Sequence, residues 1–345
     1  IYVGNDFFEN DYLYMNQKNG TFKEVISSDE LQLGHTTHYS MGNAIADINN
    51  DSFSDIVSLD MLPEDLYTYK TSGLEYAYPI YQQYIKNGYA PQFMQNTLHI
   101  NNNGHNFSEI GNLSGISATE WSWGSLLADF DNDGYKDLFI SNGIKGATND
   151  MDYMNFIANE KIQRRIDTGM DNTDMPLIKE IPEKKVSNYF FKNKGDLKFD
   201  DMSAQWLNAE PSYSNGCTYA DLDNDGDLDI VVNNIDDELY ILENTLKNSQ
   251  YLSVKLNGAK ENRFGLGAKL SLYSQSGTQV LEHYTTNGYL SSSSNKLLFG
   301  IAKDTVIDSL KIVWPDNKEQ KLVHLKINQE IIIDYENSSK PTKKH

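Results

Sequence analysis

The chain has 345 residues, of which 39% are hydrophobic and 12% aromatic, with 22 tyrosines. A chain of this length exceeds the roughly 250–300 residues at which one core stops growing, so we expect two domains, and the aromatic content favours strands. The formal net charge of -20 argues against nucleic acid as a partner. No apolar run reaches the roughly 18–20 residues that span a bilayer, and the single cysteine, Cys217, excludes internal disulfides but leaves the compartment open.

A hairpin recurs along the first 250 residues, beginning near the N-terminus. Residues 12–16 form a β-type run before an Asn-Gly turn, and the same order returns at 97–107 and, with a Lys-Gly turn, at 189–199. Glycine turns of this kind between β-forming runs predict antiparallel hairpins.

A second pattern marks another hairpin in each repeat. It reads aromatic-Ser-x-Gly-x-x-x-Ala-Asp, begins at Tyr39, Trp121 and Tyr213, and runs into a nine-residue acidic loop at 47–55, 129–137 or 221–229. A short apolar run follows each loop, so each loop is expected to join two strands. Together the two hairpins make a unit of four antiparallel strands, and such units repeated around an axis form a β-propeller.

Insertions account for the long spacing of these units. The acidic loops begin at 47, 129 and 221 and are therefore 82 and 92 residues apart, against roughly 40–50 residues per blade. We assign insertions to the Tyr-rich segment 61–90 and to 143–187, where we expect a helix over 153–166. Both follow the second strand of a blade and should emerge on one face. Residues 1–6 read as a strand that follows an acidic loop, so we expect a partial propeller whose upstream blades are missing.

The acidic loops carry the pattern of a calcium site. Oxygen-bearing side chains at positions 1, 3, 5 and 9, with the backbone carbonyl of position 7, supply the hard oxygen shell that Ca²⁺ prefers. The loops lack the Glu at position 12 of an EF-hand and are flanked by strands, which excludes that motif. The alternative is that Asp and Asn only favour turns, but four aspartates in nine residues would repel one another without a cation.

We therefore predict calcium at the second and third loops, and a third, weaker site at the first, where Asn49 and Ser52 replace Asp and Gly. The predicted ligands are Asp47, Asn49, Asp51, Phe53 and Asp55; Asp129, Asp131, Asp133, Tyr135 and Asp137; and Asp221, Asp223, Asp225, Asp227 and Asp229.

The remaining chain predicts a second, all-β domain. Residues 251–337 contain short alternating segments separated by turn residues, which is typical of a small sandwich or barrel. The glycines near Arg263 fit tight turns better than a phosphate-binding loop. We expect residues 338–345 to be a flexible tail.

Two family resemblances follow from these residues. The motif-plus-loop repeats of residues 1 to about 245 resemble the FG-GAP or VCBS repeats, calcium-loop propellers related to integrin α-subunit heads. Residues 251–335 resemble the ASPIC/UnbV domain of cartilage acidic protein and of many bacterial secreted proteins, through Asn262–Ala268, Gly288–Ser291, Leu298–Gly300 and Val306–Asp316. The pairing, with Tyr-rich insertions, is similar to Bacteroidetes surface proteins that accompany outer-membrane nutrient-uptake systems.

The resemblance also implies a recognition face. In related propellers the calcium loops lie on one face, so the starts of the first strands and the insertions lie on the other. We expect Tyr39, Trp121, Trp123, Tyr213 and His38 to contact a ligand there, because aromatic side chains offer rigid contact area. The alternative is that these aromatics pack between blades.

The sequence favours binding over catalysis. It contains no His-Glu-x-x-His, no Gly-x-Ser-x-Gly and no Cys/His nucleophile pattern. We expect a non-catalytic, calcium-stabilised binding or scaffold protein whose partner is another protein, such as an outer-membrane nutrient-uptake complex, or a glycan. The alternative is a glycan-binding propeller or a carbohydrate-active enzyme that uses the channel face. Calcium loops with dissociation constants of roughly 10⁻⁴–10⁻³ M fill only outside the cytosol, which favours an extracellular or bacterial outer-membrane location.

Overall fold

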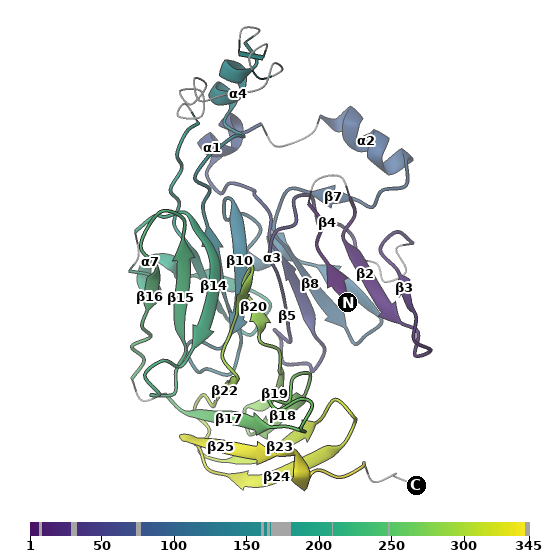
Figure 1. Ribbon diagram of the computed structural model, residues 1–345, viewed down its shortest axis with the longest axis vertical. Helices are drawn as coiled ribbons and strands as arrows, with labels where there is room; N and C mark the ends of the chain where they lie inside the picture. Colours follow the sequence, from purple (N-terminus) through teal and green to yellow (C-terminus); the bar gives the residue numbers. More distant parts are fainter. Residues whose placement is uncertain are drawn as a thin grey trace.

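The computed structural model describes residues 1–6, 9–28, 33–73, 77–159, 162–163, 166, 181–208, 210–247 and 249–341. It is an all-β molecule with a few short helices (Figure 1). Four sheets stand side by side like propeller blades, without closing a ring, and a smaller β-domain lies against one end of them.

The four sheets have the predicted antiparallel order, and we number them as blades along the chain. Blade 1 contains β1 (Tyr2–Val3), β2 (Tyr12–Asn16) and β3 (Phe22–Glu24). Blade 2 contains β5 (Asn43–Ala46), β6 (Asp55–Ser58), β8 (Thr97–Asn102) and β9 (Asn106–Glu109). Blade 3 contains β10 (Ser122–Ala128), β11 (Asp137–Asn142), β12 (Tyr189–Asn193) and β13 (Phe199–Asp201). Blade 4 contains β14 (Ser214–Ala220), β15 (Asp229–Asn234) and β16 (Tyr240–Leu242).

Each acidic loop joins the first two strands of a blade, as predicted, and β1 pairs with β2 as β6 pairs with β8. Apolar side chains from adjacent blades fill the space between them. One core joins Val57 and Leu98 of blade 2 to Leu138 and Ile140 of blade 3. A second core continues from Phe139 into blade 4. Burial of these facing surfaces holds the blades in a row.

Both insertions emerge at the end of the blades that lies opposite the C-terminal domain (Figure 1). The first carries α1 (Leu66–Thr71), α2 (Tyr78–Lys86) and β7 (Gln92–Phe93), which pairs in parallel with β4 (Thr36–Thr37). The second carries α4 (Met151–Ile157), so the expected helix begins two residues before 153 and, among the described residues, ends at 157. Beyond α4, residues 162–163 and 166 are again helical, whereas 160–161 and 164–165 of the predicted helix lie outside the described residues. Short helices α3 (Gly111–Ser114) and α7 (Ser203–Trp206) follow β9 and β13.

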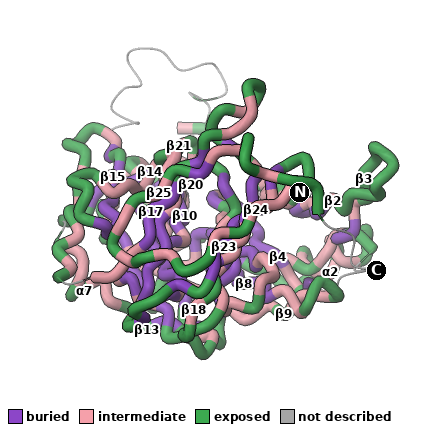
Figure 2. Tube along the Cα trace, turned by 90° about the horizontal axis from the view of Figure 1, so that it is seen from below, coloured by how far each residue is buried: buried purple, intermediate pink, exposed green. Residues whose placement is uncertain are grey.

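The C-terminal domain is a sandwich of two sheets. One has the order β22 (Lys296–Gly300), β17 (Tyr251–Asn257), β25 (Gln329–Asp334), with β17 and β25 parallel. The other has the order β19 (Gly277–Glu282), β18 (Lys269–Ser274), β23 (Ile307–Val313), β24 (Glu319–Leu325). Trp314, only 2% exposed, packs in the core between them. Viewed from below, this domain lies over the inner strands of the blades (Figure 2).

The end of the chain corrects one prediction. A 3-10 helix, η2 (Tyr335–Asn337), is followed by Ser339, which exchanges two backbone hydrogen bonds of 2.7 and 3.0 Å with Glu319. The segment from 338 is therefore not a tail at its start, because it bridges to β24. Residues 342–345 lie outside the described residues.

One hairpin of the C-terminal domain leaves the sandwich. It consists of β20 (Thr286–Asn287) and β21 (Ser291–Ser292), and Figure 1 shows it running up beside β10 and β14. The Thr218 hydroxyl donates a 2.9 Å hydrogen bond to the carbonyl of Ser292, which ties the hairpin to blade 4. The second domain therefore contacts both the end and the inner surface of the blades.

Candidate metal centre and recognition face

The three acidic loops share one internal hydrogen-bond pattern. The aspartate at position 9 of each loop accepts from the backbone N–H of position 2 and from the N–H of an asparagine at or just beyond the end of the third strand. These asparagines are Asn101, Asn193 and Asn244, at 2.8, 2.9 and 2.9 Å from Asp55, Asp137 and Asp229. The sequence repeat therefore produces the same local structure three times.

Left-handed backbone at positions 4 and 6 closes each loop. Position 4 is Asn in all three, with φ between 55° and 64°, because Asn tolerates this conformation. Position 6 is Gly134 and Gly226 in two loops, with φ of 94° and 95°, but Ser52 in the first, with φ of 75°. The Asp47 loop (47–55) therefore holds a non-glycine residue in the left-handed region at position 6, and its weaker calcium site stays a prediction.

Carboxylates converge in two of the loops. In the Asp129 loop (129–137), one oxygen each from Asp129, Asp131 and Asp137 lies within 4.8 Å of the others. In the Asp221 loop (221–229), Asp221, Asp223 and Asp225 do the same. Burial, aided by the charge of Asp133, raises the pKa of Asp129 to about 7. Such crowded, partly buried oxygens fit a hard divalent cation, which would relieve their repulsion.

The carboxylates of the Asp47 loop do not gather in this way in the described structure. Instead, a lysine from the neighbouring loop lies beside them. Lys136 is 4% exposed, and its ammonium donates a 2.8 Å hydrogen bond to the carbonyl of Asp47. Sequence reasoning missed this cation, although its position is visible as a lysine at position 8 of the Asp129 loop.

The loops are linked to one another in sequence. The side chain of Asn50 donates a 2.9 Å hydrogen bond to the carbonyl of Gly134, and that of Asn132 donates an identical bond to Gly226. The third member, Asn224, accepts instead from Lys296 of the C-terminal domain at 2.7 Å. The second domain therefore takes the place of a further blade at the end of this series.

The C-terminal domain also covers the middle loop. The Ala302 N–H donates to the carbonyl of Asn132 at 2.9 Å, and Gly300 lies so close to Asp129 that an added Cβ would be 2.0 Å from its Oδ2. No motif in the sequence pointed to this contact between the two domains.

The predicted recognition residues divide into two groups. Tyr39, Tyr213 and His38 are only 5%, 4% and 8% exposed, so they pack into the body and do not form a surface. Trp121 and Trp123 are half-buried, with ring centroids 6.4 Å apart. The expectation that all five form one exposed face is therefore wrong for the first three, because the chain folds back over them.

An aromatic from the other domain extends the tryptophan pair. Tyr289, at the tip of the β20–β21 hairpin, lies 5.1 Å from Trp123 between ring centroids. Beside it Leu290 is 94% exposed. This part of the site was missed, since sequence order places the hairpin in a separate domain.

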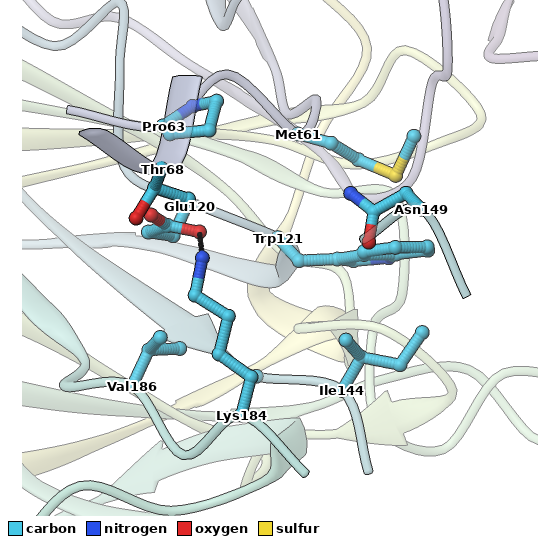
Figure 3. Close-up of a pocket in the computed structure, with 10 residues that line it drawn as sticks. Met61, Pro63, Thr68, Glu120, Trp121, Ile144, Asn149, Lys184 and Val186 are labelled. Atoms are coloured by element: carbon cyan, nitrogen blue, oxygen red, sulfur yellow. Dashed lines mark hydrogen bonds and ion pairs between the residues drawn. The ribbon is translucent and has the colours of Figure 1, made fainter. Parts of the chain in front are cut away.

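A small hollow lies beside Trp121 (Figure 3). It contains an ion pair of 2.8 Å between Lys184 and Glu120, two residues from the second insertion and the start of blade 3. Its free volume of about 20 Å³ admits about one water molecule. This hollow is too small for a sugar ring.

The insertion helices form a larger feature of the same face. None of α1, α2 and α4 has a buried residue, and the two insertions meet through a backbone bridge between Ser72 and Asp150. Their exposed apolar side chains are Leu66, Tyr67, Tyr78, Ile80, Met151, Met154 and Phe156. We call this set the insertion surface. Among the described residues, no helix is long and apolar enough to cross a membrane.

Two family models match the chain over these structures. Residues 89–140 and 183–232, which include the Asp129 and Asp221 loops, match the FG-GAP-like repeat. Residues 258–340 match the ASPIC and UnbV family. No curated protein matches the chain. The fold and repeats thus define a repeat-containing binding protein of the propeller class. More particularly, the chain joins segments that match FG-GAP-like repeats to a C-terminal segment that matches the ASPIC/UnbV domain.

Proposed function

We propose that this protein is a non-catalytic, calcium-stabilised scaffold outside the cell that docks a protein partner through the insertion surface. In a bacterial cell the partner would be an outer-membrane nutrient-uptake complex, to which this chain is an accessory subunit. The observation that carries the proposal is the position of the insertion surface, at the end of the blades opposite the acidic loops and the C-terminal domain.

The charge of the insertion surface supports docking. The chain carries a net charge of -20, whereas α1 and α2 contain no acidic residue and one lysine each, and α4 contains a single aspartate, Asp152. Side chains such as Tyr67 and Tyr78 are 78% and 72% exposed. Exposed apolar side chains gathered at one end of a protein favour interaction with a partner, and Tyr is enriched in protein interfaces.

Calcium is the cation that the loops favour. Their ligands are carboxylate and carbonyl oxygens without His or Cys, which suits Ca²⁺ better than a transition metal. The role is structural, because the loops lie between the blades and the second domain. With a dissociation constant near 10⁻³–10⁻⁴ M, 10 mM Ca²⁺ would stabilise the fold by about 1.4–2.7 kcal/mol per site.

Capture from the native membrane fraction tests the docking proposal. We expect a stoichiometric partner to bind the wild-type chain and to be lost with Tyr67→Ala/Tyr78→Ala. The control is Tyr284→Ala, which removes a tyrosine that is 57% exposed on the C-terminal domain. Thermal melts in Ca²⁺ and in chelator test the calcium role separately. Equal capture by both variants would contradict the docking proposal.

A glycan remains the second candidate ligand because of one observation. Trp121, Trp123 and Tyr289 form a partly exposed aromatic row, and such rows stack against flat apolar faces. A glycan array in which binding is abolished by Trp123→Ala, with the melting temperature unchanged, would favour this candidate over protein docking.

A further inference from the structure

Among the described residues, the Asp129 loop is the one whose carboxylates form direct ion pairs with an ammonium. The lysines beside the other two loops, Lys136 and Lys296, bond instead to the Asp47 carbonyl and to the Asn224 side chain. Lys192 lies on β12, and its ammonium pairs with Asp131 and, at 2.8 Å, with Asp133. These are positions 3 and 5 of the loop, two of the predicted metal ligands. In contrast with the Asp221 loop, the position 5 carboxylate does not join the convergent group here.

The repeat defines which residues of the other two blades occupy the position of Lys192. Asn101, Asn193 and Asn244 each donate the same backbone hydrogen bond to the position 9 aspartate. The residue before each asparagine is therefore equivalent in the three blades. It is Ile100 beside the Asp47 loop, Lys192 beside the Asp129 loop and Glu243 beside the Asp221 loop. The three loops thus have a neutral, a positive and a negative neighbour at one structural position.

We propose that Lys192 lowers the Ca²⁺ affinity of the Asp129 loop, so that the Asp221 loop fills at lower calcium concentration. This inference rests on the proposed calcium function. A divalent cation that takes Asp131 and Asp133 as ligands must displace the ammonium or share the two carboxylates with it. Displacement breaks the two ion pairs of Lys192, and sharing brings the ammonium close to the metal cation. Either process opposes binding of the metal.

The lysine is positioned by packing that does not depend on the metal. Its side chain is 29% exposed, and its ammonium lies 5.8 Å from the ring centroid of Trp206. Lys192 and Trp206 both belong to blade 3, since Lys192 is on β12 and Trp206 is in the short helix α7 that follows β13. Replacement of Lys192 should therefore leave the blade folded.

The test is a calcium titration that resolves the two loops. Gly134 and Gly226 occupy position 6 of the Asp129 and Asp221 loops, and the Asp47 loop has Ser52 there. In the full chain labelled with [¹⁵N]glycine, their amide resonances report each loop separately. Lys192→Met should lower the calcium midpoint at Gly134 on the order of tenfold and leave Gly226 unchanged. The reverse transfer, Glu243→Lys, should raise the midpoint at Gly226.

The control is Lys194→Met, which changes the net charge equally but removes an ammonium paired with Asp200 of β13 at 3.3 Å. An unchanged Gly134 midpoint in Lys192→Met, or an equal shift in Lys194→Met, would overturn the inference while calcium binding stands. If neither glycine responds to calcium in any variant, the calcium function itself fails, and the inference with it.

Discussion

The contact between Gly300 and the Asp129 loop provides a direct test of how the two domains are joined. Gly300 ends β22, and its backbone does not require glycine, since its φ is not positive. The three atoms nearest to a Cβ added at Gly300 all belong to Asp129 and Asn132 of the loop. A methyl group at this position would therefore act on the interface and not on the sandwich core.

The magnitude follows from the geometry. In Gly300→Ala the new Cβ would lie 2.0 Å from Asp129 Oδ2 and 2.4 Å from the Cα of Asn132, so the domains must separate by more than about 1 Å to restore van der Waals contact. Overpacking of this kind costs about 1–3 kcal/mol. Part of that cost falls on the hydrogen bond from Ala302 to Asn132, which spans the same gap.

Small-angle scattering and limited proteolysis measure the effect. We expect Gly300→Ala to have a larger radius of gyration and to release two protease-resistant fragments, because each domain has its own core. The control is Gly146→Ala, whose added Cβ meets only the Ile181 side chain, at 3.1 Å. A wild-type radius and digestion pattern in Gly300→Ala would refute the described contact.

Two further predictions concern the buried carboxyl group of Asp60 and the left-handed backbone of Ser52. Burial raises the pKa of Asp60 from 3.8 to about 7, so its protonated form is favoured in the folded state, and stability falls as the pH rises from about 4 to about 7. The unfolding free energy of wild type minus that of Asp60→Asn should fall by a few kcal/mol, at most about 4, between these two pH values. A value that does not change with pH would contradict this prediction. Ser52→Gly should stabilise the chain by up to about 1 kcal/mol, because it relieves a left-handed residue with φ of 75°. Denaturant unfolding of the Ser52→Gly variant measures this gain, and the control is Ser54→Gly, since the φ of Ser54 is not positive. A lower unfolding free energy in Ser52→Gly than in wild type would contradict the prediction.

The repeat made much of the fold predictable. Aromatic-Ser-x-Gly motifs, nine-residue loops and glycine turns are local signals, and each determines a hairpin through the conformations its own residues prefer. The strands, their antiparallel order, the position of the loops between first and second strands and the common face of the insertions all followed from that. The repeat also relates single residues, since Asp60 occupies the position that Asn142 and Asn234 occupy in the next two blades.

Contacts between segments distant in sequence were decided only by the tertiary structure. Lys136 and Lys192 contact acidic loops, although in the sequence both resemble ordinary surface lysines. Tyr39, Tyr213 and His38 are buried because the chain packs over them, which no local pattern reveals. The seating of the C-terminal domain on the loops, and of its hairpin on blade 4, depends on shape and on hydrogen bonds between residues far apart in the chain, such as Thr218 and Ser292 at a separation of 74. Local preference thus determined the blades, whereas long-range packing determined which loops are crowded, covered or already paired with a cation.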